Sequence, residues 1–155
     1  MNNTIDDEEQ VARILFAPSF ICDGKVSPTA FRWEVLPSGH VEDYISVLRN
    51  DGNDLAQQSE HFRPRVAGDQ RYGYALLPVS GIKGLDSEFE NRKVEILAKP
   101  STKLANHAGV YVFFDDVKVT ALTPVSADIM LIQKELSLLC GEPIPFEGEM
   151  ATRQK

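Results

Sequence analysis

The sequence predicts a single compact α+β domain, with a mixed or mainly antiparallel sheet of about 5–7 strands and a long C-terminal helix on one face. Short apolar segments with strand-like patterning recur along the chain. Most connections between them are too short to hold the crossover helices that a parallel sheet needs. One extended stretch of helical periodicity, residues 124–139, lies near the C-terminus.

The composition is that of one folded domain. With 155 residues, of which 43% are hydrophobic and 25% charged, the chain can bury a core and is too apolar for general disorder. No apolar segment is long enough to cross a bilayer. We expect a globular domain over residues 11–141, an acidic flexible N-terminus (1–10) and a flexible tail containing Pro and Glu (142–155).

The net charge of −7 gives little support to nucleic-acid binding. The acidic run at residues 6–9 carries much of that charge, so the remaining body is close to neutral and lacks a clustered positive field. The first residues also lack the basic and apolar regions of a secretory signal. Cys22 and Cys140 show no metal-binding spacing. We therefore expect a protein of a bacterial-type cytoplasm, with free thiols, no cofactor and no metal site.

Several segments have the composition or the alternation of β-strands. The first is a compact apolar run, and residues 93–99 alternate apolar and polar side chains with the period of two typical of a half-buried strand. Turn residues such as Asp23-Gly24 separate the segments. The predicted strands are residues 11–17, 44–49, 72–79, 93–99, 110–114 and 117–122.

The segment 110–114 is predicted to be a central strand, because large apolar side chains occupy both of its faces. Asp115-Asp116 predicts a two-residue turn into the next strand. A histidine oriented by a carboxylate can act as a general base, which makes His107 a weak catalytic candidate. In an extended strand, however, His107 and Asp115 lie about 20 Å or more apart. The competing interpretation is that His107 bonds to a backbone carbonyl where the chain enters the sheet.

The clearest helix is the C-terminal one. Thr123 is a suitable N-cap, Pro124 fits the first turn and Gly141 suits the C-cap. One apolar stripe is predicted to lie on the sheet, and it consists of Ile129, Ile132, Leu136 and Leu139. A second apolar line, Leu131 and Leu138, must meet another segment of the chain or a partner. Shorter helical segments are predicted at residues 27–31 and 55–62.

A basic and aromatic segment, residues 61–74, is the second candidate site. Guanidinium groups offer paired donors to phosphate or carboxylate, and aromatic faces stack on planar rings. A solvated loop is the competing interpretation, and no glycine-rich phosphate loop accompanies the segment. The candidate ligand-binding residues are Arg63, Arg65, Arg71 and Tyr72, and His61 is a weak catalytic candidate.

The leading functional hypothesis is a non-catalytic binding or accessory protein that acts through a protein-partner surface, including self-association. It follows from the absence of a recognisable catalytic set and from the apolar residues left over by the predicted core. The candidate partner-binding residues are Leu131, Leu138, Ile144 and Phe146. The alternative is a small enzyme that acts on a nucleotide or another phosphorylated substrate through the Arg/His segment.

Overall fold

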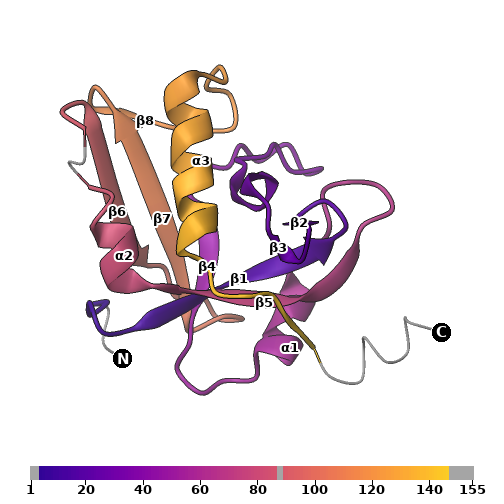
Figure 1. Cartoon of the computed structure of the whole chain (residues 1–155). Helices are drawn as coiled ribbons and strands as arrows, with labels where there is room; N and C mark the ends of the chain where they lie inside the picture. The colour runs from indigo at the N-terminus through magenta and orange to yellow at the C-terminus, as the bar shows by residue number, and fades with distance from the viewer. Residues whose placement is uncertain (1–3, 87–88, 147–155) are drawn as a thin grey trace.

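The antiparallel sheet predicted from the sequence is confirmed. The computed structural model describes residues 4–86 and 89–146, and its seven-stranded sheet has the order β6-β7-β4-β1-β5-β9, with β8 paired to β7. Every pairing in this sheet is antiparallel (Figure 1). Its strands are β1 (Gln10–Ala17), β4 (Ile45–Arg49), β5 (Gln70–Pro78), β6 (Arg92–Ala98), β7 (His107–Phe114), β8 (Val117–Lys118) and β9 (Ile144–Pro145).

Short elements complete the domain. β2 (Ile21–Cys22) and β3 (Lys25–Val26) form a separate hairpin beyond the end of β1. The helices are η1 (Pro28–Phe31), α1 (Leu55–Gln58), η2 (Ser59–His61), α2 (Val79–Lys83) and α3 (Ala127–Leu139). None of these described helices has the length and apolar character that a bilayer crossing requires.

β7 has the interior position predicted for it, because β6 and β4 pair with its two edges. The turn from β7 to β8 is also as predicted. Asp115 and Asp116 have φ angles of 52° and 64°, the left-handed conformation that a two-residue hairpin turn requires at both central positions. Aspartate tolerates this conformation better than most residues because its short side chain can bond to the local backbone.

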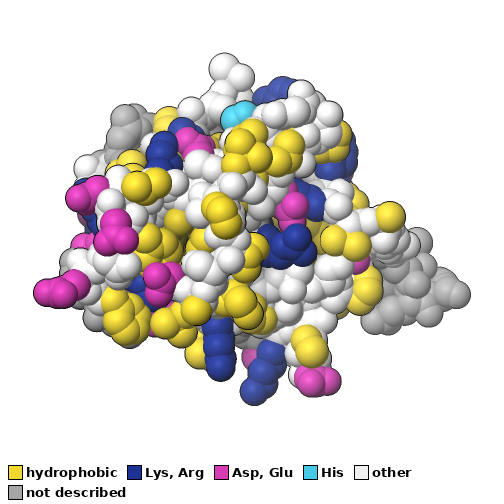
Figure 2. Space-filling view, turned by 90° about the horizontal axis from the view of Figure 1, so that it is seen from above, with side chains coloured by type: hydrophobic (Ala, Val, Ile, Leu, Met, Phe, Trp, Pro, Cys, Tyr) yellow, Lys and Arg dark blue, Asp and Glu magenta, His cyan; other side chains and the backbone are white. Residues whose placement is uncertain are grey.

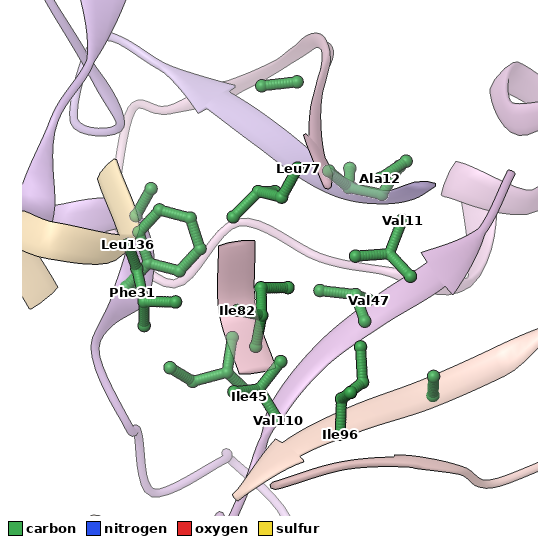
Figure 3. Packing of buried hydrophobic residues seen from close by; sticks show 14 of the residues in the cluster. Val11, Ala12, Phe31, Ile45, Val47, Leu77, Ile82, Ile96, Val110 and Leu136 are labelled. Atoms are coloured by element: carbon green, nitrogen blue, oxygen red, sulfur yellow. The ribbon is translucent and has the colours of Figure 1, made fainter. Parts of the chain in front are cut away.

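α3 lies across one face of the sheet (Figure 1). It buries three residues of the predicted stripe, Ile129, Ile132 and Leu136, and the fourth, Leu139, is partly buried against the core. Leu136 approaches Phe31 of η1 within the core (Figure 3). The predicted start of the helix is wrong by one turn. Ser126 is the N-cap and its hydroxyl accepts the Ile129 N–H at 3.3 Å.

The N-terminus was predicted to be a flexible appendage, but its described residues pack against the domain. Ile5 is buried in the core cluster, and Lys83 of α2 donates to its carbonyl at 3.0 Å. Two of the acidic side chains are paired with cations of the domain. Asp7 contacts Lys83 at 2.7 Å, and Glu9 contacts Arg49 at 2.7 Å. The flexible start predicted for residues 1–3 lies outside the described residues.

The C-terminal segment also differs from the predicted flexible tail, because Ile144–Pro145 pairs with β5 as the edge strand β9. This close approach requires Gly73, since a Cβ built there would lie 1.8 Å from the Ile144 carbonyl oxygen. Phe146 follows the strand with a side chain only 4% exposed. Its ring packs against Tyr74 with centroids 5.6 Å apart. The tail predicted for residues 147–155 lies outside the described residues.

Candidate functional site

His107 makes the carbonyl contact that the sequence predicted. Its Nδ1 lies 3.1 Å from the Lys99 carbonyl oxygen, and its Nε2 lies 3.2 Å from the Ser46 Oγ. A carbonyl can only accept, so Nδ1 carries the proton and the neutral ring accepts the Ser46 hydroxyl at Nε2. The ring also meets Tyr44 edge-on, with centroids 5.8 Å apart. His107 therefore ties β7 to β4 and to the chain after β6, and it stands at the opposite end of β7 from the two turn aspartates.

We expect His107 to titrate below the ordinary histidine range. Burial lowers the pKa of His107 from its usual value of 6.5, because the imidazolium would lose solvation. The unfolded chain then binds this proton more readily, so the stability that depends on a neutral His107 is complete above pH 6.5 and declines as the pH falls through the folded pKa. Proton NMR of the imidazole, assigned with His107→Gln, should give a midpoint below 6.5. A midpoint above that value would contradict the expectation.

A pocket of about 560 Å³ lies between the loop of residues 34–42 and the segment 61–65. It brings together three of the predicted residues, His61, Arg63 and Arg65. Apolar walls come from Val35, Leu36, Pro37, Phe62 and Pro64, and further polar groups come from Glu34, Ser38, His40, Glu42, Tyr44 and Ser46. These further residues could not be predicted from the sequence, because they come from separate segments and have no common motif.

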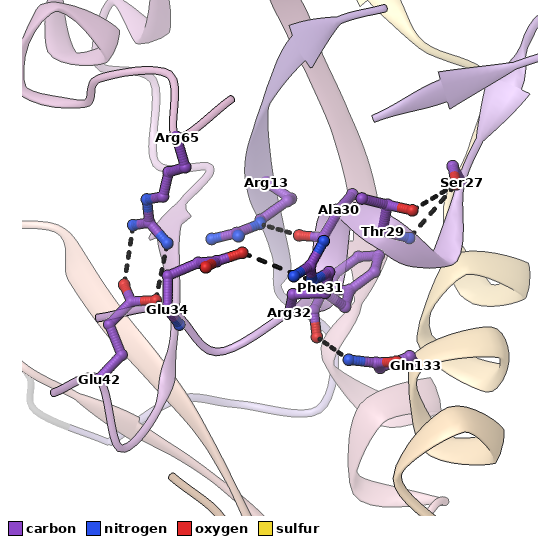
Figure 4. Close-up of polar contacts among 10 residues, drawn as sticks. All are labelled: Arg13, Ser27, Thr29, Ala30, Phe31, Arg32, Glu34, Glu42, Arg65 and Gln133. Carbon is purple, nitrogen blue, oxygen red and sulfur yellow. Dashed lines mark hydrogen bonds and ion pairs between the residues drawn. The ribbon is translucent and has the colours of Figure 1, made fainter. Parts of the chain in front are cut away.

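Arg65 holds the two sides of this pocket together. Its Nη1 and Nη2 donate to the two carboxylate oxygens of Glu42 at 2.7 and 2.8 Å (Figure 4). Glu42 is only 8% exposed and also accepts the Glu34 N–H at 2.8 Å. Such a paired geometry is strong and directional. The charge predicted to hold an anionic ligand is thus already neutralised within the protein.

Arg63 is different, because its side chain is exposed at the rim of the pocket. Its Nη1 donates to the carbonyls of Glu60 and Phe62. Carbonyl oxygens satisfy hydrogen bonds without cancelling a positive charge. Within residues 4–86 and 89–146, Arg63 forms no ion pair, so it presents a full charge to the pocket.

Arg71 and Tyr72 lie apart from the pocket. Both belong to β5, where Arg71 pairs in register with Phe16 of β1 and the Tyr72 carbonyl accepts the Phe146 N–H at 3.1 Å. The chain turns between Arg65 and β5 at Gly68, whose φ of 90° suits glycine. The candidate residues are close in the sequence, but this turn leaves Arg63 and Arg65 at the pocket and carries Arg71 and Tyr72 away from it on β5.

A second surface of interest is the outward side of α3. Leu131 is 39% exposed and Leu138 is 73% exposed, although Leu136 between them is fully buried. Leu122, Val125 and Met130 are exposed nearby. The view from above shows hydrophobic side chains among charged ones at the end of the molecule where α3 begins (Figure 2). Leu122 was predicted to end a strand and Val125 to lie in the first turn of the helix, so the sequence did not mark either of them as an exposed surface residue.

The other two predicted partner-binding residues do not belong to this surface. Ile144 is partly exposed on β9, at the edge of the sheet. Phe146 was predicted to be an exposed docking anchor. It is instead buried against Tyr74 of the same chain. Its burial follows from the β5–β9 pairing, which the sequence pattern did not indicate. Comparison with protein-family models, curated proteins and solved structures finds no match.

Proposed function

We propose that the protein is a non-catalytic binding protein whose partner surface is the outward side of α3. The surface consists of Leu131 and Leu138, extended by the apolar residues at 122 and 125. The observation that supports it is the exposure of two leucines aligned seven residues apart on one side of a helix. Aligned apolar side chains on a helix are the usual anchors of helix-mediated recognition.

The rigidity of α3 strengthens this proposal. Glu135 pairs with Arg92 of β6 at 2.6 Å, and the Gln133 side chain donates to the Phe31 carbonyl at 3.3 Å (Figure 4). The helix is therefore held to both the sheet and η1. A partner that binds a rigid helix loses less conformational entropy at the interface than one that must first order it.

Position-specific photo-crosslinking in the protein's native cells tests this proposal. A photoreactive residue at position 138 should give a covalent adduct of defined mass. The matched control is position 97, where Leu97 is also exposed but belongs to β6 rather than α3. Adducts of equal yield from the two positions, or no adduct from either, would reject the α3 surface.

A second candidate function is the binding of a nucleotide or another phosphorylated compound in the 560 Å³ pocket. The observation that favours it is the unneutralised Arg63 at the rim of a pocket with apolar walls. Phe62 and Tyr44 line the same space and offer ring faces on which a base can stack.

The Arg63→Ala variant should lose any thermal stabilisation that adenosine monophosphate gives to the wild-type protein. Its own melting temperature should hardly change, because Arg63 is exposed and bonds only to carbonyls. Arg65→Ala is the contrast, since it leaves the buried Glu42 carboxylate without its cation and should melt at a lower temperature. Differential scanning fluorimetry measures both effects. Equal ligand-induced shifts in the wild type and Arg63→Ala would contradict this candidate.

A further inference from the structure

We propose that a second copy of this chain occupies the outward side of α3, in an antiparallel helix pair with a two-fold axis at Leu131. This inference rests on the proposed partner surface and names the partner. It follows from the order of apolar and charged residues along the exposed line of the helix.

The exposed line of α3 runs through Asp128, Leu131, Lys134 and Leu138. Spacings of three and four residues place these side chains on one side of the helix. Val125, just before the helix begins, is also exposed. Within the described residues, neither Asp128 nor Lys134 forms an ion pair, so both charges are available to a partner.

In an antiparallel pair centred on Leu131, each side chain of this line contacts a complementary part of the second copy. Positions equally far from the axis on opposite sides then face each other. Leu131 meets its own counterpart, and Asp128 meets Lys134 of the second copy. Leu138 meets the segment of the second copy around Val125, so the exposed apolar groups at both ends are covered.

Charge selects this arrangement over the alternatives. A parallel pair in register would place Asp128 beside Asp128 and Lys134 beside Lys134, and like charges in contact repel. The antiparallel arrangement forms the Asp128–Lys134 contact twice and aligns the helix dipoles favourably. Exposed ion pairs contribute little to affinity but do fix register. A self-complementary patch of this kind gives a closed dimer.

Disulfide trapping in a Cys22→Ser background tests the register. Leu131→Cys should form a linked dimer on oxidation, because the axis brings the two new thiols together. Leu138→Cys, at a more exposed position, should stay largely unlinked, because the segment around positions 124 and 125 of the second copy faces it. Combining Leu138→Cys with Val125→Cys should restore linkage. Equal linkage of the two single variants would overturn the register.

Sedimentation analysis of the native mass tests the association itself. The wild type should have twice the mass of one chain, and the Asp128→Lys substitution should lower the native mass towards that of a single chain. Adding Lys134→Asp to that variant should restore the dimer, a result that loss of folding cannot produce. A wild type with the mass of one chain at every concentration would overturn this inference alone, provided that position 138 still crosslinks to another protein in cells. Absence of both results would reject the proposed partner surface as well.

Discussion

The Arg92→Ala variant is expected to lose about 3–5 kcal/mol of its free energy of unfolding, the range found when one partner of a buried ion pair is removed. Arg92 is 3% exposed on β6, and its Nη2 donates to the Glu135 carboxylate at 2.6 Å. Its guanidinium also lies 4.7 Å from the ring centroid of Phe89. The substitution leaves Glu135 without its cation and opens space between β6 and α3.

Urea unfolding of Arg92→Ala beside Lys93→Ala separates this effect from simple loss of charge. Lys93 is the next residue on the same strand, and its contact with Glu95 is long at 3.5 Å and solvent-exposed, so its loss should cost less than about 1 kcal/mol. The double variant Arg92→Met with Glu135→Leu should recover much of the loss, because no buried charge then remains unpaired. Similar unfolding midpoints for Arg92→Ala and Lys93→Ala would show that the pair contributes nothing.

Leu136→Ala should lower the free energy of unfolding by about 2–5 kcal/mol, the range for leucine truncation in a packed core. Leu136 is 0% exposed and packs near Phe31 and Ile82, between α3 and the sheet (Figure 3). Removing its side chain beyond Cβ leaves a cavity that the surrounding strands can fill only in part. The same change therefore tests whether α3 is a structural part of the core.

Met130→Ala is the matched control for this prediction, because Met130 is an exposed residue of the same helix. Its substitution should change stability by less than about 0.5 kcal/mol. Chemical unfolding followed by far-UV circular dichroism measures both variants. A small effect of Leu136→Ala would mean that α3 does not pack on the sheet as described.

Local signals in the sequence were enough to predict the main elements of the fold. Residues 110–114 were predicted to be interior because bulky groups occupy both faces, and β7 is paired on both edges. The turn after β7 was predicted from two aspartates that tolerate positive φ. The period of the apolar residues in α3 identified the buried side of that helix. These properties depend on neighbouring residues alone.

Where two neighbouring residues suit the same role equally well, the sequence alone could not predict which of them takes it. Thr123 and Ser126 are both good helix caps, and only the folded chain shows which one is used. The Thr123 hydroxyl accepts the Thr120 N–H at 2.9 Å instead, which leaves Ser126 to begin α3. The two residues of β9 carry no strand pattern, and their pairing depends on the absence of a side chain at Gly73.

The sequence by itself determined the antiparallel α+β architecture, the two apolar sides of α3 and the segment that carries Arg63 and His61. Only the tertiary structure decided that Arg65 is neutralised by Glu42 and that Phe146 is buried in its own chain. It also assembled the pocket from the loop of residues 34–42 and the segment 61–65. The physical reason is that periodicity and turn chemistry act over a few residues, whereas charge pairing and pocket formation join segments that meet only when the chain has folded.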